Sequence, residues 1–135
     1  MPVFFDTNVL VYCIDPRDSN KQTQAQRLVR QASLSAEGVI STQVLIELYN
    51  VLGRKLRVPD VERLAVVQAY MGWPVIDSDI SLVAAAMEKS VRHQLTIFDA
   101  MVVEAALRSG ATTLYSEDMQ HGRRFGSLTI TNPFI

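Results

Sequence analysis

The chain contains one cysteine, two histidines and six glycines among 135 residues, and none of its uninterrupted apolar runs is longer than six residues. A single cysteine excludes a disulfide scaffold, and so little glycine excludes a collagen-like chain. A transmembrane helix needs about 20 apolar residues, so we expect no membrane span. No basic leader precedes Asp6, so we also expect no secretory signal and a cytoplasmic protein.

An excess of charge of one sign is also missing. Lys and Arg number 13 and Asp and Glu number 14, which gives a formal net charge of −1. A protein that binds nucleic acid mainly through its overall field usually has a clear basic excess, so any such contact must come from local patches. Apolar residues make up 48% of the chain, which excludes a disordered protein and fits one compact domain over residues 1–135.

Short strand-like segments alternate with amphipathic helical segments along the chain. Apolar positions recur at helical spacing between Ser19 and Ser35, for example, and we expect that helix to end near Gly38. Such alternation predicts an α/β fold with a mostly parallel central sheet of four to five strands and helices on both faces. The expected strands are 3–5, 39–40, 74–76, 112–115 and 127–131, and the expected helices begin near residues 7, 19, 42, 60, 80 and 98.

Two acidic residues occupy helical positions that should be apolar. Glu47 falls in the stripe formed by Val44, Leu48 and Val51, and Asp99 heads a similar stripe in a later helix. An ionised carboxylate that is buried without a partner costs several kcal/mol, so each of these groups needs a cation, a donor or a proton. Glu47 is the less readily explained of the two, because a residue in the middle of a helix caps neither end.

Two further acids follow predicted strands. Asp6 comes directly after the first strand, and Asp118 follows the strand that ends near Tyr115. In open parallel sheets the carboxyl ends of the strands form the ligand-binding edge, and the helices that carry Glu47 and Asp99 begin at that edge. We therefore expect all four carboxylates to converge there, although 41, 52 and 19 residues separate them in sequence.

A divalent cation is the best counter-charge for such a cluster. The chain has only three lysines, none of which follows a predicted strand, and its cysteine and histidines are too few for a structural zinc site. Carboxylate oxygens favour hard ions such as Mg²⁺ or Mn²⁺. An ion of this kind suits the hydrolysis of a phosphodiester or phosphomonoester.

Four short segments carry a family resemblance. Phe5-Asp6-Thr7-Asn8, the Gln43–Glu47 segment, Phe98-Asp99-Ala100 and Tyr115–Met119 resemble, in order, the acidic motifs of the PIN-domain nucleases. The resemblance covers the whole chain, and small members of the family are typically VapC-type toxins of toxin–antitoxin pairs. It implies a Mg²⁺- or Mn²⁺-dependent endoribonuclease that acts on RNA, forms a homodimer and is held inactive by a cognate antitoxin.

The resemblance also implies roles for individual residues. Asp6, Glu47 and Asp99 match the three acids that hold the metal, and Asp118 matches a fourth that completes the coordination or orients the water. Two polar residues match positions that support these acids, namely Asn8 and Ser116. Many members have one more acid where this chain has Gln120, so a fifth ligand is not expected.

Local arginines are the candidates for RNA contact. Arg123 and Arg124 lie five and six residues beyond Asp118 and are favoured for phosphate binding, although a solvated loop pair is an equal alternative. Arg54, Lys55 and Arg57, at the end of the third helix, form a second basic group.

Other interpretations of the acids stay open at the level of sequence. Asp6 could cap a helix, and Asp99 could be an acid in the first turn of a helix, where the helix dipole favours negative charge. Asp118 could belong to a turn, and Glu47 could pair with an arginine. Among whole-chain functions, an inactive RNA-binding scaffold is the main alternative. A receiver-like signalling domain or an aspartyl phosphatase fits less well, because Thr7 follows Asp6, position 8 is Asn and no lysine lies beyond Lys89.

Overall fold

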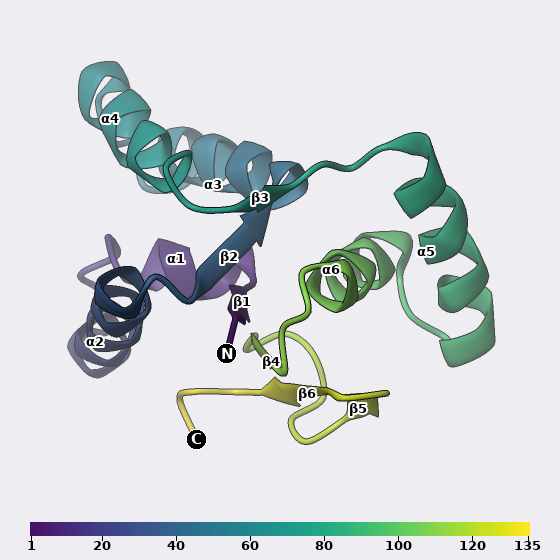
Figure 1. The fold of residues 1–135 in the computed structure, drawn as a ribbon. Helices are drawn as coiled ribbons and strands as arrows, with labels where there is room; N and C mark the ends of the chain where they lie inside the picture. Colours follow the sequence, from purple (N-terminus) through teal and green to yellow (C-terminus); the bar gives the residue numbers. More distant parts are fainter.

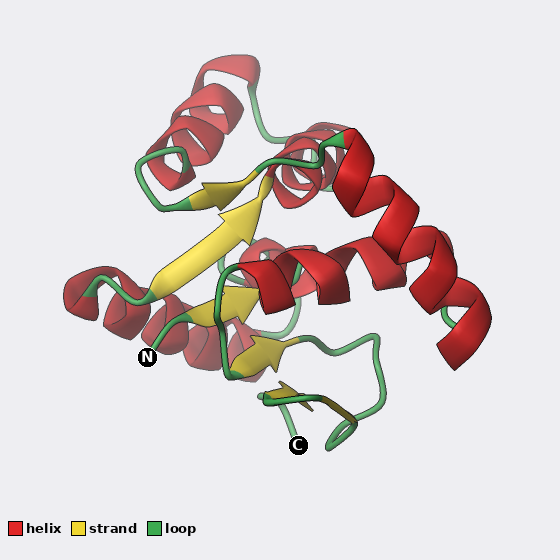
Figure 2. Ribbon diagram, turned by 45° about the vertical axis from the view of Figure 1, so that its right-hand side comes forward, coloured by secondary structure: helices red, strands yellow, loops and turns green.

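The computed structural model describes all residues from 1 to 135 and is built around one six-stranded sheet (Figures 1 and 2). The strand order is β3-β2-β1-β4-β6-β5, and every neighbouring pair is parallel except β5 and β6, which are antiparallel. The strands are β1 (Val3–Phe5), β2 (Gly38–Ser41), β3 (Val75–Ile76), β4 (Thr113–Tyr115), β5 (Arg124–Phe125) and β6 (Leu128–Thr131). The mostly parallel α/β sheet is therefore confirmed.

The number of strands is six rather than the four to five expected, because the prediction missed β5. This strand has only two residues, too few to show any periodicity. A tight turn through Gly126, whose φ of 59° suits glycine, pairs Phe125 with Leu128 and creates the antiparallel edge.

Six helices connect the strands, and most begin at a side-chain cap. They are α1 (Thr7–Tyr12), α2 (Ser19–Ser35), α3 (Thr42–Arg54), α4 (Asp60–Tyr70), α5 (Ile80–His93) and α6 (Ile97–Arg108). Ser41 caps α3 by accepting from Val44 N at 3.3 Å, and Asp79 caps α5 by accepting from Leu82 N at 2.9 Å. These two caps fix where α3 and α5 start relative to β2 and β3, the strands before them.

The end of α2 differs slightly from the prediction. Ala36, with φ of 58°, takes the left-handed position after the helix, while Gly38 instead begins β2. A Cβ at Gly38 would lie 2.6 Å from the ring of Trp73, so glycine is needed there for close packing rather than for a helix end.

The helices form layers around the sheet (Figure 1). α1 and α2 lie on one side of it, α5 and α6 on the other, and α3 and α4 near the end formed by β2 and β3. The hydrophobic core lies between these layers and includes the fully buried Phe4, Leu48 and Leu114. No helix combines the length and the apolar character that crossing a bilayer requires.

Candidate active site

Asp6 is the best-anchored carboxylate of the site. It lies where β1 ends and α1 begins, and only 7% of its surface is exposed. One oxygen, Oδ1, accepts from Thr7 N at 2.8 Å and so caps α1. The other, Oδ2, accepts from the Ser116 hydroxyl at 2.8 Å and from Asn8 Nδ2 at 3.2 Å. Asp6 therefore both caps α1 and belongs to the polar site.

Asn8 and Ser116 join Asp6 to Asp118, because parallel pairing of β1 with β4 brings the two strand ends together. Nδ2 of Asn8 also lies 3.1 Å from Asp118 Oδ2, and its Oδ1 accepts from Glu117 N at 3.0 Å. The backbone N of Asp118 donates to Ser116 Oγ at 3.2 Å. The two residues expected to support the acids therefore lie in direct contact with two of them.

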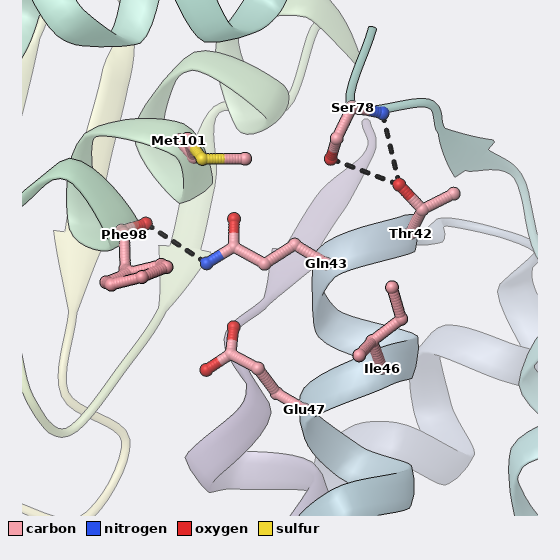
Figure 3. A pocket seen from close by; sticks show the side chains of 7 residues that line it. All are labelled: Thr42, Gln43, Ile46, Glu47, Ser78, Phe98 and Met101. Carbon is pink, nitrogen blue, oxygen red and sulfur yellow. Dashed lines mark hydrogen bonds between the residues drawn. The ribbon is translucent and has the colours of Figure 1, made fainter.

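Glu47 approaches the same region from α3 (Figure 3). Its side chain is half-buried at the edge of the core-facing stripe, not inside the core. The oxygen Oε1 is buried and has no hydrogen-bond partner. The carboxylate lines two cavities, one of about 410 Å³ beside Phe98 and Met101 and one of about 310 Å³ beside Asn8 and Asp118.

Asp99 lies in the first turn of α6, where its backbone N donates to the Oγ1 of the capping Thr96 at 3.1 Å. The Gln43 amide on α3 donates to the carbonyl of Phe98 at 3.3 Å and thereby links the start of α3 to the start of α6 (Figure 3). This hydrogen bond connects the first turns of the two helices that carry Glu47 and Asp99.

Burial and the charges of the neighbouring acids shift the pKa values of three of the four carboxylates. The pKa of Asp6 is raised to about 6, chiefly by burial. Hydrogen bonds from Ser116 and Thr7 oppose this rise, and the charges of Glu47 and Asp118 add to it. Burial also raises the pKa of Glu47, opposed by the Gln43 amide, and the charges of Asp99 and Asp118 add to the rise.

Burial likewise raises the pKa of Asp99; the capping Thr96 opposes this rise and the charge of Asp118 increases it. None of the four acids forms an ion pair with Lys, Arg or His. The main alternative from the sequence, an ion pair between Glu47 and an arginine, is therefore wrong.

The donor set fits a hard divalent cation in its chemistry. All four groups offer carboxylate oxygens, and Glu47 Oε1 is an acceptor without a donor in a region of repelling negative charge. The type of donor atom fits such an ion, but the side chains do not form a complete metal site, because no three His, Cys, Asp or Glu side chains stand at metal-ligand spacing.

Two further acids, Glu117 and Asp15, lie beside the site and have partners that were not expected from the sequence. Glu117 accepts from Tyr12 at 2.7 Å and from Lys21 at 2.6 Å, so it is engaged by α1 and α2. Asp15, only 5% exposed, binds Arg17 through a 2.7 Å ion pair. The Asp-Pro-Arg spacing at 15–17 could have indicated this second pair; no sequence signal joins Lys21 to Glu117, which lie 96 residues apart.

The two favoured arginines have different surroundings. Arg123 donates to the carbonyl of His93 at 2.9 Å and lies over the ring of Phe125, so its guanidinium is already engaged in the fold. Arg124 is exposed on the edge strand β5.

A comparison with family models identifies the fold family. The model described as "PIN domain" matches residues 3–124, which is most of the chain. The chain belongs to the PIN domain family. The resemblance drawn from the acidic motifs is thereby confirmed at the level of the family.

Solved structures share the fold of this PIN domain at low sequence identity. Mycobacterium tuberculosis VapC20, described as a sarcin–ricin loop cleaving toxin, is 22% identical with a TM-score of 0.70, over 86% of this chain and 89% of that one. A toxin–antitoxin complex from Klebsiella pneumoniae is 16% identical with a TM-score of 0.69, over 97% of each chain. VapBC2 from Rickettsia felis, bound to a promoter DNA fragment, is 19% identical with a TM-score of 0.66, over 98% of each chain. No curated protein matches the chain by sequence.

Proposed function

We propose that this PIN domain is a divalent-metal-dependent endoribonuclease that hydrolyses RNA phosphodiester bonds. The observation that carries the proposal is that Asn8 contacts both Asp6 and Asp118, that Glu47 lines one cavity with Asp118, and that a hydrogen bond links the helix of Glu47 to that of Asp99. None of these four acids has a cationic partner. The unpartnered Oε1 of Glu47 adds to it. In the PIN family, acids in these positions hold Mg²⁺ or Mn²⁺.

Each residue has a role in this proposal. Asp6, Glu47, Asp99 and Asp118 would hold the ion; when bound, the ion lowers the pKa of a water molecule and neutralises phosphate charge. Asn8 orients Asp6 and Asp118 through its single amide, and the Ser116 hydroxyl fixes Oδ2 of Asp6. With an ion held there, no histidine base would be required.

We also propose that the domain is the toxin of a toxin–antitoxin module, acts in the cytoplasm as a homodimer and is held inactive by a cognate antitoxin. The fold supports this proposal, because VapC20 and chains of two toxin–antitoxin complexes share it over most of their length. The two cavities that meet at Glu47 leave its carboxylate open to a substrate or an inhibitory segment.

A metal-dependent cleavage assay on total cellular RNA tests the catalytic proposal. We expect discrete fragments with Mg²⁺ or Mn²⁺, none in excess EDTA, and none from the Asp99→Asn variant, whose amide keeps the shape and loses the charge. Glu62→Gln, an exposed change on α4, is a matched control. Equal cleavage by the wild type and by Asp99→Asn would rule the proposal out.

A catalytically inactive RNA-binding scaffold is the second candidate. One observation favours it, namely that no three acidic or other ligating side chains stand at metal-ligand spacing. Calorimetric titration with Mn²⁺ at neutral pH separates the two candidates, since the scaffold predicts no binding and the nuclease predicts binding that Asp99→Asn weakens.

A further inference from the structure

The cavity of about 310 Å³ beside the acids has walls of opposite charge. It lies between the end of α1 and the end of α3, with Glu47 and Asp118 among its acidic lining residues. Arg17, from the α1–α2 loop, and Lys55, which follows α3, line the same cavity. Two cations from separate segments therefore face the space into which the acidic site opens.

Lys55 differs from the other two lysines of the chain in having no carboxylate partner. Lys21 forms an ion pair with Glu117 at 2.6 Å, and Lys89 forms one with Glu104 at 3.6 Å. Lys55 is exposed and forms no ion pair or side-chain hydrogen bond, although acids line its cavity. No ion pair or hydrogen bond holds its ammonium group, which is therefore available to a ligand.

Arg17 is held in place and still has donors to spare. Nε and Nη2 bind the buried carboxylate of Asp15, at 2.9 Å from Nε to Oδ1 and 2.7 Å from Nη2 to Oδ2. Nη1 has no partner. A guanidinium that is fixed on one side and free on the other suits a phosphate oxygen, because little side-chain entropy remains to be lost on binding.

The two cations also connect this cavity to a second one. A neighbouring cavity of about 280 Å³ is lined by Asp15, Arg17 and Lys55 as well, together with Leu56 and Val58. Arg17 and Lys55 therefore line both cavities. A nucleic-acid chain that passes through the two would bring its charged backbone next to both side chains.

We propose that Lys55 and Arg17 form a subsite for a backbone phosphate of the nucleic acid whose bond is cut at the carboxylates. This inference rests on the nuclease function proposed above. It assigns the phosphate contact to Arg17 and Lys55 in place of Arg123 and Arg124, which line neither cavity. Phosphate is favoured over an acidic peptide because Arg17 and Lys55 line the same cavity as Glu47 and Asp118, where the nuclease function proposed above already places a nucleic-acid backbone.

The test is equilibrium binding of a fluorescently labelled single-stranded oligoribonucleotide to the full chain, followed by anisotropy at several salt concentrations. All proteins carry Asp99→Asn and the buffer contains Mg²⁺, so that cleavage does not interfere. We expect Lys55→Met to weaken binding about fivefold and to reduce the slope of log K against log salt by about 0.7, as for one lost phosphate contact on a single strand. Lys55→Arg should restore both quantities.

Lys89→Met is the matched control, since it removes the same charge on α5 away from the cavity, and it should leave binding unchanged. Unchanged affinity in Lys55→Met, or a loss no larger than in Lys89→Met, would overturn the subsite and favour a peptide ligand for these cations. Failure of the Asp99→Asn protein itself to bind the oligonucleotide would also overturn the subsite. Cleavage by the wild-type chain is measured separately, so failure of the nuclease proposal is distinguished from failure of the subsite.

Discussion

The Ser116 hydroxyl donates a 2.8 Å hydrogen bond to Oδ2 of Asp6 across 110 residues of sequence. Both residues are buried, and each directly follows a strand of the parallel β1–β4 pair. The register of that pair thus sets the position of the oxygen that faces Asn8 and the acidic site. A hydroxyl at the end of one strand positions a carboxylate at the end of another.

Removal of this hydroxyl should weaken metal binding. In Ser116→Ala, Asp6 loses the donor that both orients Oδ2 and lowers its pKa. We expect Mn²⁺ affinity at neutral pH to fall about tenfold, as for other residues that orient metal ligands. Calorimetry measures the change, and Ser33→Ala, an exposed change on α2, is the control. Equal affinities of Ser116→Ala and wild type would contradict the role given to Ser116.

The metal-free protein should become less stable as the pH rises from about 4 to about 6. Burial raises the pKa of Asp6 from 3.8 to about 6, so the folded state binds more protons than the unfolded state in this window. The free energy of unfolding therefore falls as the pH rises through it and stays lower above it. The raised pKa values of Glu47 and Asp99 act in the same direction.

Asp6→Asn should reduce the dependence of the free energy of unfolding on pH. Asparagine can still cap α1 and carries no charge to bury, so we expect the metal-free variant to gain on the order of 1–3 kcal/mol over wild type near neutral pH. Urea unfolding in EDTA at several pH values measures both effects. A variant that is less stable than wild type at neutral pH, with an unchanged pH profile, would be inconsistent with the burial of a charged Asp6.

A divalent ion should stabilise the fold through the same carboxylates. At an Mn²⁺ concentration about 100 times its dissociation constant, we expect a gain of about 2.7 kcal/mol over the metal-free protein. Glu47→Gln should lose most of this gain, because it removes the carboxylate with the unpartnered oxygen, while its metal-free stability should equal or exceed that of wild type. Thermal unfolding with and without Mn²⁺ gives the comparison, with Glu62→Gln as control. An equal gain in Glu47→Gln and wild type would exclude Glu47 as a ligand.

Gly38→Ala should destabilise the sheet near β2. The new Cβ would lie 2.6 Å from the Trp73 ring, which must move, and overpacking of this kind costs about 1–3 kcal/mol. Trp73 is the only tryptophan, so its fluorescence should report the displacement. At Gly72 an added Cβ meets only the Ala69 carbonyl at 3.4 Å, which makes Gly72→Ala a nearby control. Identical spectra and stabilities for Gly38→Ala and Gly72→Ala would refute this packing argument.

Elements with a clear periodic signal were predictable from the sequence, whereas β5 was not. The helix α2 begins at Ser19 as predicted, because the spacing of its buried side chains repeats over several turns, although it ends before the expected Gly38. Arg124 and Phe125 become a strand only because Gly126 turns the chain back along β6. A segment of two residues has too little local information to specify its own structure.

By itself, the sequence determined the alternation of strands and helices, the position of two acids just after strands and the position of two more within helices. These are local properties, set by side-chain polarity and the periods of the two kinds of element. The tertiary structure alone decided that Asn8 contacts both Asp6 and Asp118, that Glu47 keeps an unpartnered oxygen, and that Lys55 lacks the carboxylate that Lys21 and Lys89 have. Such pairings depend on strand register and helix packing, which bring distant residues within a few ångströms of each other, and no local pattern encodes that proximity.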